Sequence, residues 1–368
     1  MSQAEMDRRF MAATIRLSRR NLGLTATNPS VGTLIVRDDG QGPRIIGSGV
    51  TALGGRPHAE AEALAEAGER ARGATAYVTL EPCAHHGRTP PCAEALVAAG
   101  IARVVGAAAD PDPRVAGRGY AILEAAGIEV TRDVMAGAAA DLMRGYLTRS
   151  VRKRPEVTLK LAISADGMIG RKGEGQVAIS GAMSRRQSHR LRAESDAILI
   201  GIGTAIADDP ELTCRLPGLE KRSPIRIVLD KDARLPLHSR LVETARQTPV
   251  LLASGINADV GRRQKLEAAG VGFIACDVHE GRIALPEFLE DLAARGVMTV
   301  LVEGGAETAR RFLDEGLVDR LVLFSSNTRI GGDGIASPVS LESLPEEFKL
   351  LRRDRFGDDH CHEYIREY

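Results

Sequence analysis

Residues 75–92, TAYVTLEPCAHHGRTPPC, carry the pattern that decides the fold of the first part of this 368-residue chain. The first six residues form an apolar, aromatic and β-branched run, which is typical of a buried strand. The run ends at Glu81-Pro82-Cys83, and Cys92 then follows a proline pair and opens the alanine-rich segment CAEALVAAG. The stretch therefore predicts a strand, a loop and a short helix, with one cysteine at each end of the loop.

Two roles are open to these cysteines, a disulfide or a metal site. The chain contains five cysteines, and an odd number fits a disulfide framework poorly. The N-terminal segment is charged at short intervals, and no apolar run approaches the ~20 residues that span a bilayer. We therefore expect a cytoplasmic protein with reduced thiols, and a metal site is favoured.

Composition restricts the class of partner. The chain has 49 Lys and Arg against 49 Asp and Glu, and 43% of its residues are hydrophobic. This balance is typical of a soluble globular protein and argues against nucleic-acid and membrane partners. A small-molecule substrate is expected, and the length predicts two domains.

Working outward from the opening stretch, strands and helices alternate over the first half of the chain. The runs VGTLIV (31–36) and RIIGSGV (44–50) predict a hairpin, and HAEAEALAEAGERARG (58–73) predicts a helix that ends at a glycine. Strand ARVVGAAA (102–109), helix GYAILEAAG (119–127) and strand IEVT (128–131) follow. The alternation predicts a partly parallel sheet with helices on both faces.

A second α/β pattern begins after the basic, turn-prone stretch RGYLTRSVRKRPE (144–156), so the domain boundary is predicted near residue 150. Strand VTLKLAIS (157–164) opens this half, and a strand-like run, CHEYIREY (361–368), ends it. Within it, strand MTVLVEGG (298–305) leads through a glycine pair into a helix. Such a junction offers backbone N–H groups to a phosphate, although glycine pairs are common at ordinary turns.

Three separate elements of the first half place metal-binding side chains at their ends. His58 begins the predicted helix, Cys83 follows the buried strand and Cys92 opens the next helix. One imidazole and two thiolates suit zinc with a fourth position open for water. Glu60, in the first turn after His58, is placed to carry protons without being a ligand. Each feature alone is unremarkable, but their position at one sheet edge predicts a catalytic zinc site.

The surrounding residues resemble one family closely. His58-Ala59-Glu60 and the run from Thr79 to Cys92, with NPSVG (28–32), DPDP (110–113) and VAGRG (115–119), are similar to the bifunctional riboflavin-biosynthesis deaminase/reductases. Zinc deaminases in general have two residues between their cysteines, whereas residues 84–91 separate them here. That longer spacer is the family's own version.

The resemblance implies a cytidine-deaminase-like α/β/α domain over residues 1–149 and a dihydrofolate-reductase-like α/β domain over residues 150–368. In the first, hydroxide on a zinc ion held by His58, Cys83 and Cys92 would hydrolytically deaminate diaminohydroxyphosphoribosylaminopyrimidine, with Glu60 as the catalytic acid–base. The expected substrate contacts there are Asn28, His85 and Arg88. An Asx-type turn before proline is the alternative role for Asn28.

The second half extends the resemblance, from Leu159–Gly167 through Leu191–Ala193 and Ala207–Arg215 to Pro224–Asp230 and Glu303. It implies NADPH-dependent reduction of the ribosylamino side chain of the aminouracil phosphate product to ribitylamino. The expected substrate contacts are Arg192, Leu212, Arg215 and Glu303, and the expected NADPH contacts are Ile163, Thr204, Asp208, Gly305, Ala306, Glu307 and Thr308. Relatives often have a tryptophan near the nicotinamide, where this chain has Val177 or Ala178.

A homo-oligomer is also expected. Two other functions stay open at this point. One is a deaminase of another nucleoside or nucleic-acid base whose second half only binds ligands, and the other is a structural zinc protein without enzymatic activity.

Overall fold

The computed structural model describes residues 2–86 and 90–368. The chain divides into two compact units, of which the first ends at Lys153 and the second begins at Arg154. The segment 144–156, predicted to be turn-prone at its end, begins with a helix, α6, that ends at Arg152. Among the described residues, no helix combines the length and apolar character needed to cross a membrane.

The first unit is built on a five-stranded sheet in the order β2-β1-β3-β4-β5. Strand β1 is antiparallel to β2 and β3, whereas β3, β4 and β5 are parallel. The strands are β1 (Gly32–Arg37), β2 (Arg44–Val50), β3 (Thr75–Leu80), β4 (Arg103–Ala108) and β5 (Glu129–Thr131), and the helices are α1 (Gln3–Ser18), α2 (Ala59–Ala67), α3 (Cys92–Ala98), α4 (Arg118–Ala125), α5 (Ala136–Leu142) and α6 (Arg144–Arg152).

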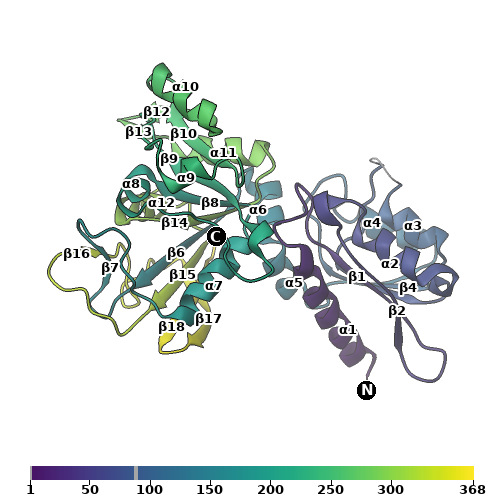
Figure 1. Ribbon diagram of the computed structural model, residues 1–368. Coiled ribbons are helices and arrows are strands. Elements are labelled where there is room, and N and C mark those ends of the chain that lie inside the picture. The colour runs from purple at the N-terminus through teal and green to yellow at the C-terminus, as the bar shows by residue number, and fades with distance from the viewer. Residues whose placement is uncertain (1, 87–89) are drawn as a thin grey trace. The chain divides into compact units, whose positions relative to one another are not determined.

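Helices cover both faces of this sheet (Figure 1). Helix α2 packs on β1 and β2 and forms a layer with α3 and α4, whereas α1 and α5 pack together on the other face. The predicted hairpin and the partly parallel, two-sided sheet are confirmed.

Helix α2 lies very close to β2, because β2 presents two glycines to it. A Cβ atom on Gly47 would approach the carbonyl oxygen of Ala63 to 2.2 Å, and one on Gly49 would approach that of Ala59 to 2.0 Å. Any larger residue would push the helix outward. The pattern RIIGSGV thus fixes the position of the helix whose N-terminus carries His58 and Glu60.

The second unit contains a nine-stranded sheet in the order β11-β10-β9-β8-β14-β6-β15-β18-β17. Its strands are β6 (Glu156–Ile163), β8 (Ala197–Gly201), β9 (Ile225–Leu229), β10 (Val250–Gly255), β11 (Gly272–Cys276), β14 (Thr299–Glu303), β15 (Arg320–Ser325), β17 (Phe348–Phe356) and β18 (Asp359–Arg366). Two short pairs, β7 (Met168–Arg171) with β16 (Gly334–Ala336) and β12 (Val278–His279) with β13 (Arg282–Ile283), lie outside it. The helices are α7 (Ala182–Ala193), α8 (Ile202–Asp208), α9 (Arg240–Glu243), α10 (Val260–Ala269), α11 (Leu285–Ala294) and α12 (Ala306–Asp314).

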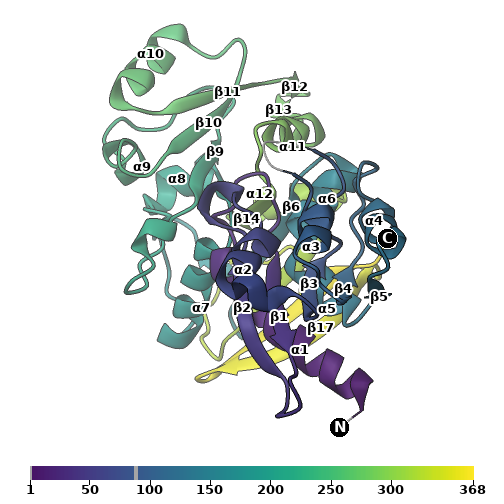
Figure 2. The same cartoon turned by 90° about the vertical axis from the view of Figure 1, so that its right-hand side faces the viewer.

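The strands from β11 to β15 along this sheet are parallel, and the hairpin β17–β18 adds an antiparallel pairing at one edge. Figure 2 shows α9 and α10 beside β9, β10 and β11 at the opposite end. Alternate side chains of the central strands enter two apolar clusters, with Leu199 and Ile227 in one and Ile198 and Val228 in the other. Both faces of these strands are therefore buried, as their largely apolar runs predict.

Candidate active sites

In the first unit, three elements bring His58, Cys83 and Cys92 together. His58 immediately precedes α2, Cys83 follows β3, and Cys92 is the first residue of α3. Their candidate ligand atoms all lie within 4.8 Å of one another. His58 Nδ1 is 3.3 Å from Cys92 Sγ and 3.7 Å from Cys83 Sγ.

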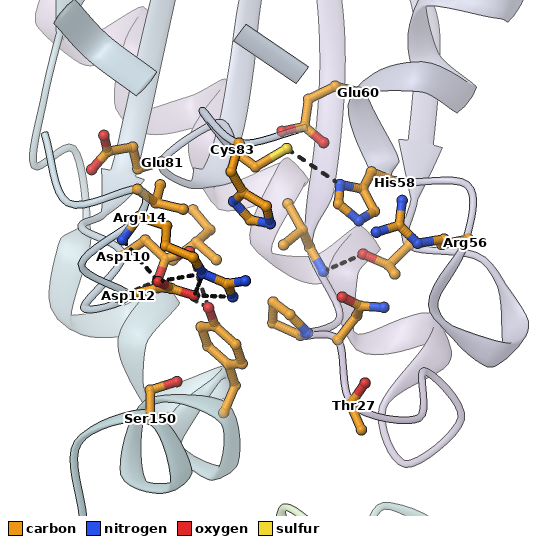
Figure 3. A pocket seen from close by; sticks show the side chains of 18 of the residues that line it. Thr27, Arg56, His58, Glu60, Glu81, Cys83, Asp110, Asp112, Arg114 and Ser150 are labelled. Carbon is orange, nitrogen blue, oxygen red and sulfur yellow. Dashed lines mark hydrogen bonds and ion pairs between the residues drawn. The ribbon is translucent and has the colours of Figure 1, made fainter. Parts of the chain in front are cut away.

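This donor set fits a zinc ion. Nδ1 of His58 faces the two sulfur atoms, so one imidazole and two thiols converge on a single point, as in catalytic zinc sites with one open position. Glu60 is not part of the converging set found among the described residues. Figure 3 shows its carboxyl group beside the sulfur of Cys83 and the ring of His58.

The electrostatics of the site favour a thiolate at Cys83 and a carboxyl group at Glu60 that titrates near neutral pH. Hydrogen bonding from the Cys92 thiol is the largest cause that lowers the pKa of Cys83 to about 4, and His58 and the Cys92 backbone N–H add to it. The same hydrogen bond, together with burial, raises the pKa of Cys92. Burial raises the pKa of Glu60 to about 7, and the negative charge on Cys83 adds to that shift. Glu60 can therefore take up and release a proton near neutral pH.

The zinc-ligand candidates His58 and Cys83 line a cavity of about 310 Å³ in the first unit, together with Asn28, Glu60 and His85. Asn28 Nδ2 donates to the carbonyl oxygen of Gly55 at 3.2 Å, a contact 27 residues away along the chain. Among the described residues, this long-range hydrogen bond holds the Asn28 side-chain amide, and no Asx-type turn is formed. Arg88, the other predicted substrate contact, lies outside the described residues.

The cavity also has a wall that the sequence did not reveal. The hydroxyl group of Tyr146, from α6, donates to both carboxylate oxygens of Asp110 at 2.9 and 3.1 Å, and Asp112 pairs with Arg114 at 2.5 Å. Figure 3 shows Asp110, Asp112 and Arg114 on the side of the cavity away from Glu60. The helical spacing of Met143, Leu147 and Val151 was the available signal for α6.

Glu81 links the loop that carries Cys83 to helix α4. Its carboxylate accepts hydrogen bonds from the backbone N–H groups of Gly117 and Gly119, both at 3.0 Å, at the N-terminus of α4. A Cβ atom on Gly119 would come within 1.9 Å of the carbonyl oxygen of Pro82. The loop that carries Cys83 is therefore fastened to α4.

The second unit contains a larger cavity of about 820 Å³. The structure brings all but one of the predicted reductase residues to its wall: Arg192, Thr204, Asp208, Leu212, Arg215, Glu303, Gly305, Ala306, Glu307 and Thr308. Ile163 is the exception, because its side chain is 6% exposed and belongs to the apolar core. Val177 and Ala178, which stand in the region of the tryptophan of relatives, also line the cavity.

Arg192 and Glu303 form a bidentate ion pair in this wall. Arg192 Nε and Nη2 donate to the two carboxylate oxygens of Glu303, each at 2.9 Å, and both side chains are mostly buried. Burial alone would raise the pKa of Glu303, but the charges of Arg192 and Lys160 outweigh it and lower the pKa to about 2. Glu303 is therefore ionised at neutral pH.

Lys160 was not predicted as a site residue. It lies on β6 and lines the same cavity, and burial lowers its pKa, with the charge of Arg192 adding and that of Glu303 opposing. A lysine in an otherwise apolar central strand, VTLKLAI, was a visible sequence signal.

The turn between β14 and α12 approaches α8 closely. The backbone N–H of Gly305 donates to Thr204 Oγ1 at 2.9 Å, and a Cβ atom on Gly201 would come within 2.5 Å of Thr308 Oγ1. The first turn of α12, which follows Gly305, therefore lies at the cavity wall, where its backbone N–H groups can meet an anion.

Comparison with known proteins identifies a family for each half of the chain. The model of the cytidine and deoxycytidylate deaminase zinc-binding region matches residues 4–108, and that of the RibD C-terminal domain matches residues 155–362. The riboflavin biosynthesis protein RibD of Escherichia coli is 38% identical, with 96% of this chain and 98% of that protein covered. RibD of Aquifex aeolicus is 37% identical, with 96% and 97% covered.

Solved structures give the same result. Acinetobacter baumannii RibD superposes with a TM-score of 0.86 at 37% identity, with both chains fully covered. A diaminohydroxyphosphoribosylaminopyrimidine deaminase/5-amino-6-(5-phosphoribosylamino)uracil reductase from Thermotoga maritima gives a TM-score of 0.86 at 31% identity, again over the full length of both. These similarities confirm the predicted fold class of both halves.

Proposed function

The chain belongs to the RibD family, the bifunctional deaminase/reductases of riboflavin biosynthesis, and from this premise we propose how its residues divide the two reactions. The first unit would deaminate diaminohydroxyphosphoribosylaminopyrimidine, and the second would reduce the ribosylamino group of the product with NADPH. A small-molecule substrate, a homo-oligomeric assembly and a cytoplasmic location are part of this proposal.

His58, Cys83 and Cys92 would hold a zinc ion, which when bound makes a water molecule nucleophilic at neutral pH. Glu60 would take a proton from that water and donate it to the leaving amine, and its pKa of about 7 suits both directions of transfer. Asn28 and His85 would orient the pyrimidine from the cavity wall. Arg88, in the loop between the two cysteines, is proposed as a further substrate contact because of the resemblance of that loop to the family.

In the second unit, Thr204 and the Gly305–Thr308 turn would hold NADPH, which supplies the hydride when bound. The close approach of α12 to α8 supports this, since the backbone N–H groups in the first turn of α12, after Gly305, can meet a pyrophosphate at close range. Asp208 lines the same cavity and would also contact NADPH. The side chain of Ile163 lies in the apolar core, so a contact of Ile163 with NADPH would be made by its backbone.

The reductase substrate would be held by Leu212, Arg215 and the Arg192–Glu303 pair. Because Glu303 stays ionised, we assign the proton-donating role to Lys160, whose Nζ has no hydrogen bond or ion pair among the described residues. A lysine with a lowered pKa gives up a proton more readily than an exposed one. The acid would then be Nζ of Lys160, a residue that lines the same cavity.

The observation that carries the proposal is the convergence of His58, Cys83 and Cys92 beside the buried carboxyl group of Glu60. The variant Glu60→Gln tests it. We expect ammonia release to fall by about 10²–10⁴-fold while zinc content stays at the wild-type level, measured by elemental analysis of the same sample.

Glu62→Gln is the matched control, because Glu62 lies in the same turn of α2 but is exposed. Its ammonia release should equal that of the wild type. A Glu60→Gln protein that releases ammonia at the normal rate would contradict the catalytic role and favour a structural zinc site.

A further inference from the structure

Arg226, on β9, is a fully buried arginine with no role in the reactions described above. Its side chain is 0% exposed, it does not line either cavity, and no carboxylate pairs with it among the described residues. Burial lowers its pKa to about 10, with the charge of Glu211 opposing. A buried cation is costly unless its donors are satisfied, so its hydrogen-bond partners indicate what it holds.

Those partners are neutral and come from two segments. Nη1 donates to the carbonyl oxygen of Glu211 at 3.1 Å and to Thr244 Oγ1 at 2.7 Å. Nη2 donates to the carbonyl oxygen of Thr244 at 3.1 Å and to that of Thr248. The planar guanidinium therefore ties the loop at Glu211 to the segment that follows α9.

The loop at Glu211 is the one that presents Leu212 and Arg215 to the reductase cavity. Leu212 has φ = 58°, in the left-handed region that residues other than glycine adopt rarely. It is also 4% exposed and packs in an apolar cluster of the second unit. Such a conformation persists only where surrounding contacts impose it.

Further contacts fasten the two sides of this loop. Asp209 Oδ1 accepts from the backbone N–H of Arg240 at 2.9 Å, and the backbone N–H of Cys214 donates to Ser223 Oγ at 3.0 Å. Between them, the hydrogen bond to Glu211 is made one residue before the strained Leu212. Arg226 thus holds the backbone at Glu211, directly before the left-handed conformation of Leu212.

We propose that Arg226 is a positioning residue that sets the affinity of the reductase site for its phosphorylated substrate by fixing the loop of Leu212 and Arg215. This rests on the proposed function, in which that loop contacts the substrate. Thr204 and Asp208 belong to α8, and the Gly305–Thr308 turn leads into α12; none of them has a hydrogen bond to Arg226 among the described residues. Cofactor binding should therefore be independent of it.

The test uses full-length Arg226→Met and Arg226→Lys proteins. We expect the KM for the deaminated substrate to rise about tenfold or more in Arg226→Met, with kcat within about threefold of the wild type. The lysine variant keeps the charge but not the fork that spans Glu211 and Thr248, so it should show a smaller rise in KM. NADPH affinity, from a fluorescence titration, and ammonia release should be unchanged in both.

Arg263→Met is the control, because Arg263, on α10, stacks on Phe273 at 5.1 Å and makes no hydrogen bond or ion pair with the loop among the described residues. It should leave the KM unchanged. An unchanged KM in Arg226→Met, or a fall in kcat at constant KM, overturns the proposal. So does loss of NADPH binding in both Arg226 variants, because the residue would then serve folding alone. If the wild type itself fails to oxidise NADPH with this substrate, the proposed function fails instead.

Discussion

The thiol of Cys83 lies in a setting that favours its charged form, because the Cys92 thiol, His58 and a backbone N–H all donate toward it. A thiolate binds zinc, whereas a serine hydroxyl does not ionise in this pH range. We therefore expect Cys83→Ser to lose at least about tenfold in zinc affinity, measured by competition with a chromogenic chelator. Cys276→Ala, a core position of the second unit, should keep the wild-type affinity. Equal affinities in the two variants would exclude Cys83 as a ligand.

The Arg192–Glu303 pair predicts a pH dependence of stability. The pKa of Glu303 is about 2 in the folded protein, below its ordinary value of about 4.3. The pair therefore contributes its full stability above about pH 5 and loses it as pH falls toward 2. Glu303→Gln leaves a buried guanidinium without its counter-charge, so the free energy of unfolding of the second unit should fall by about 3 kcal/mol at pH 7.

Denaturant unfolding between pH 4 and pH 8 measures this difference. It should stay constant from pH 8 to about pH 5 and shrink below that. Glu211→Gln is the control, because its pair with Arg215 is exposed and should contribute less than about 1 kcal/mol. A difference that grows toward acid pH would contradict the assigned charge state.

Individual residues also show how far the sequence could predict the sites. His58, Glu60 and Cys83 belong to short motifs, so local pattern was enough to select them. Asp110 and Tyr146 lie 36 residues apart, and only the packing of α6 reveals their contact. The side chain of Ile163, predicted to contact NADPH, lies in the core with those of Leu159 and Leu161, and Leu161 also lines the cavity with Lys160 and Ala162.

At the scale of elements, the close packing of α2 on β2 positions the deaminase site. Gly49→Ala would place a Cβ atom 2.0 Å from the carbonyl oxygen of Ala59, so α2 must shift. We expect the first unit to lose about 1–3 kcal/mol of stability and ammonia release to fall with it, because the shift displaces His58 and Glu60. Thermal unfolding and the ammonia assay measure the two effects.

Gly137→Ala provides the contrast, since Gly137 lies inside α5 and a Cβ atom added there would meet no heavy atom within 4 Å outside its own helix turn. This change should stabilise the protein by about 0.5–1 kcal/mol through helix propensity. If both glycine variants behave alike, the close approach of α2 is not what holds the site in place.

Elements differed in how well their pattern predicted them. β8 and β14 are buried on both faces, and their continuous apolar runs identified them. β17, FKLLRRDRF, was not predicted, because five consecutive residues after Phe348 are exposed at the edge of the sheet and no apolar alternation results. Helix α6 was missed because its basic residues outnumber the few side chains that pack.

At the scale of the whole molecule, each unit contains its own complete cavity. The residues that line the zinc-site cavity all belong to the first unit, and those that line the larger cavity all belong to the second. The two reactions should therefore be separable by treatments that affect one site. Zinc removal is the most selective of these, because the candidate ligands found among the described residues all lie in the first unit.

The most direct test of two reactions in one chain follows ammonia release and NADPH oxidation together in one sample. With diaminohydroxyphosphoribosylaminopyrimidine as substrate, we expect one NADPH oxidised per ammonia released. Chelation of zinc should stop both signals, whereas NADPH oxidation should continue when the deaminated product is supplied to the chelated protein. NADPH oxidation without ammonia release from the amino substrate, or no oxidation with the deaminated product, would contradict the account.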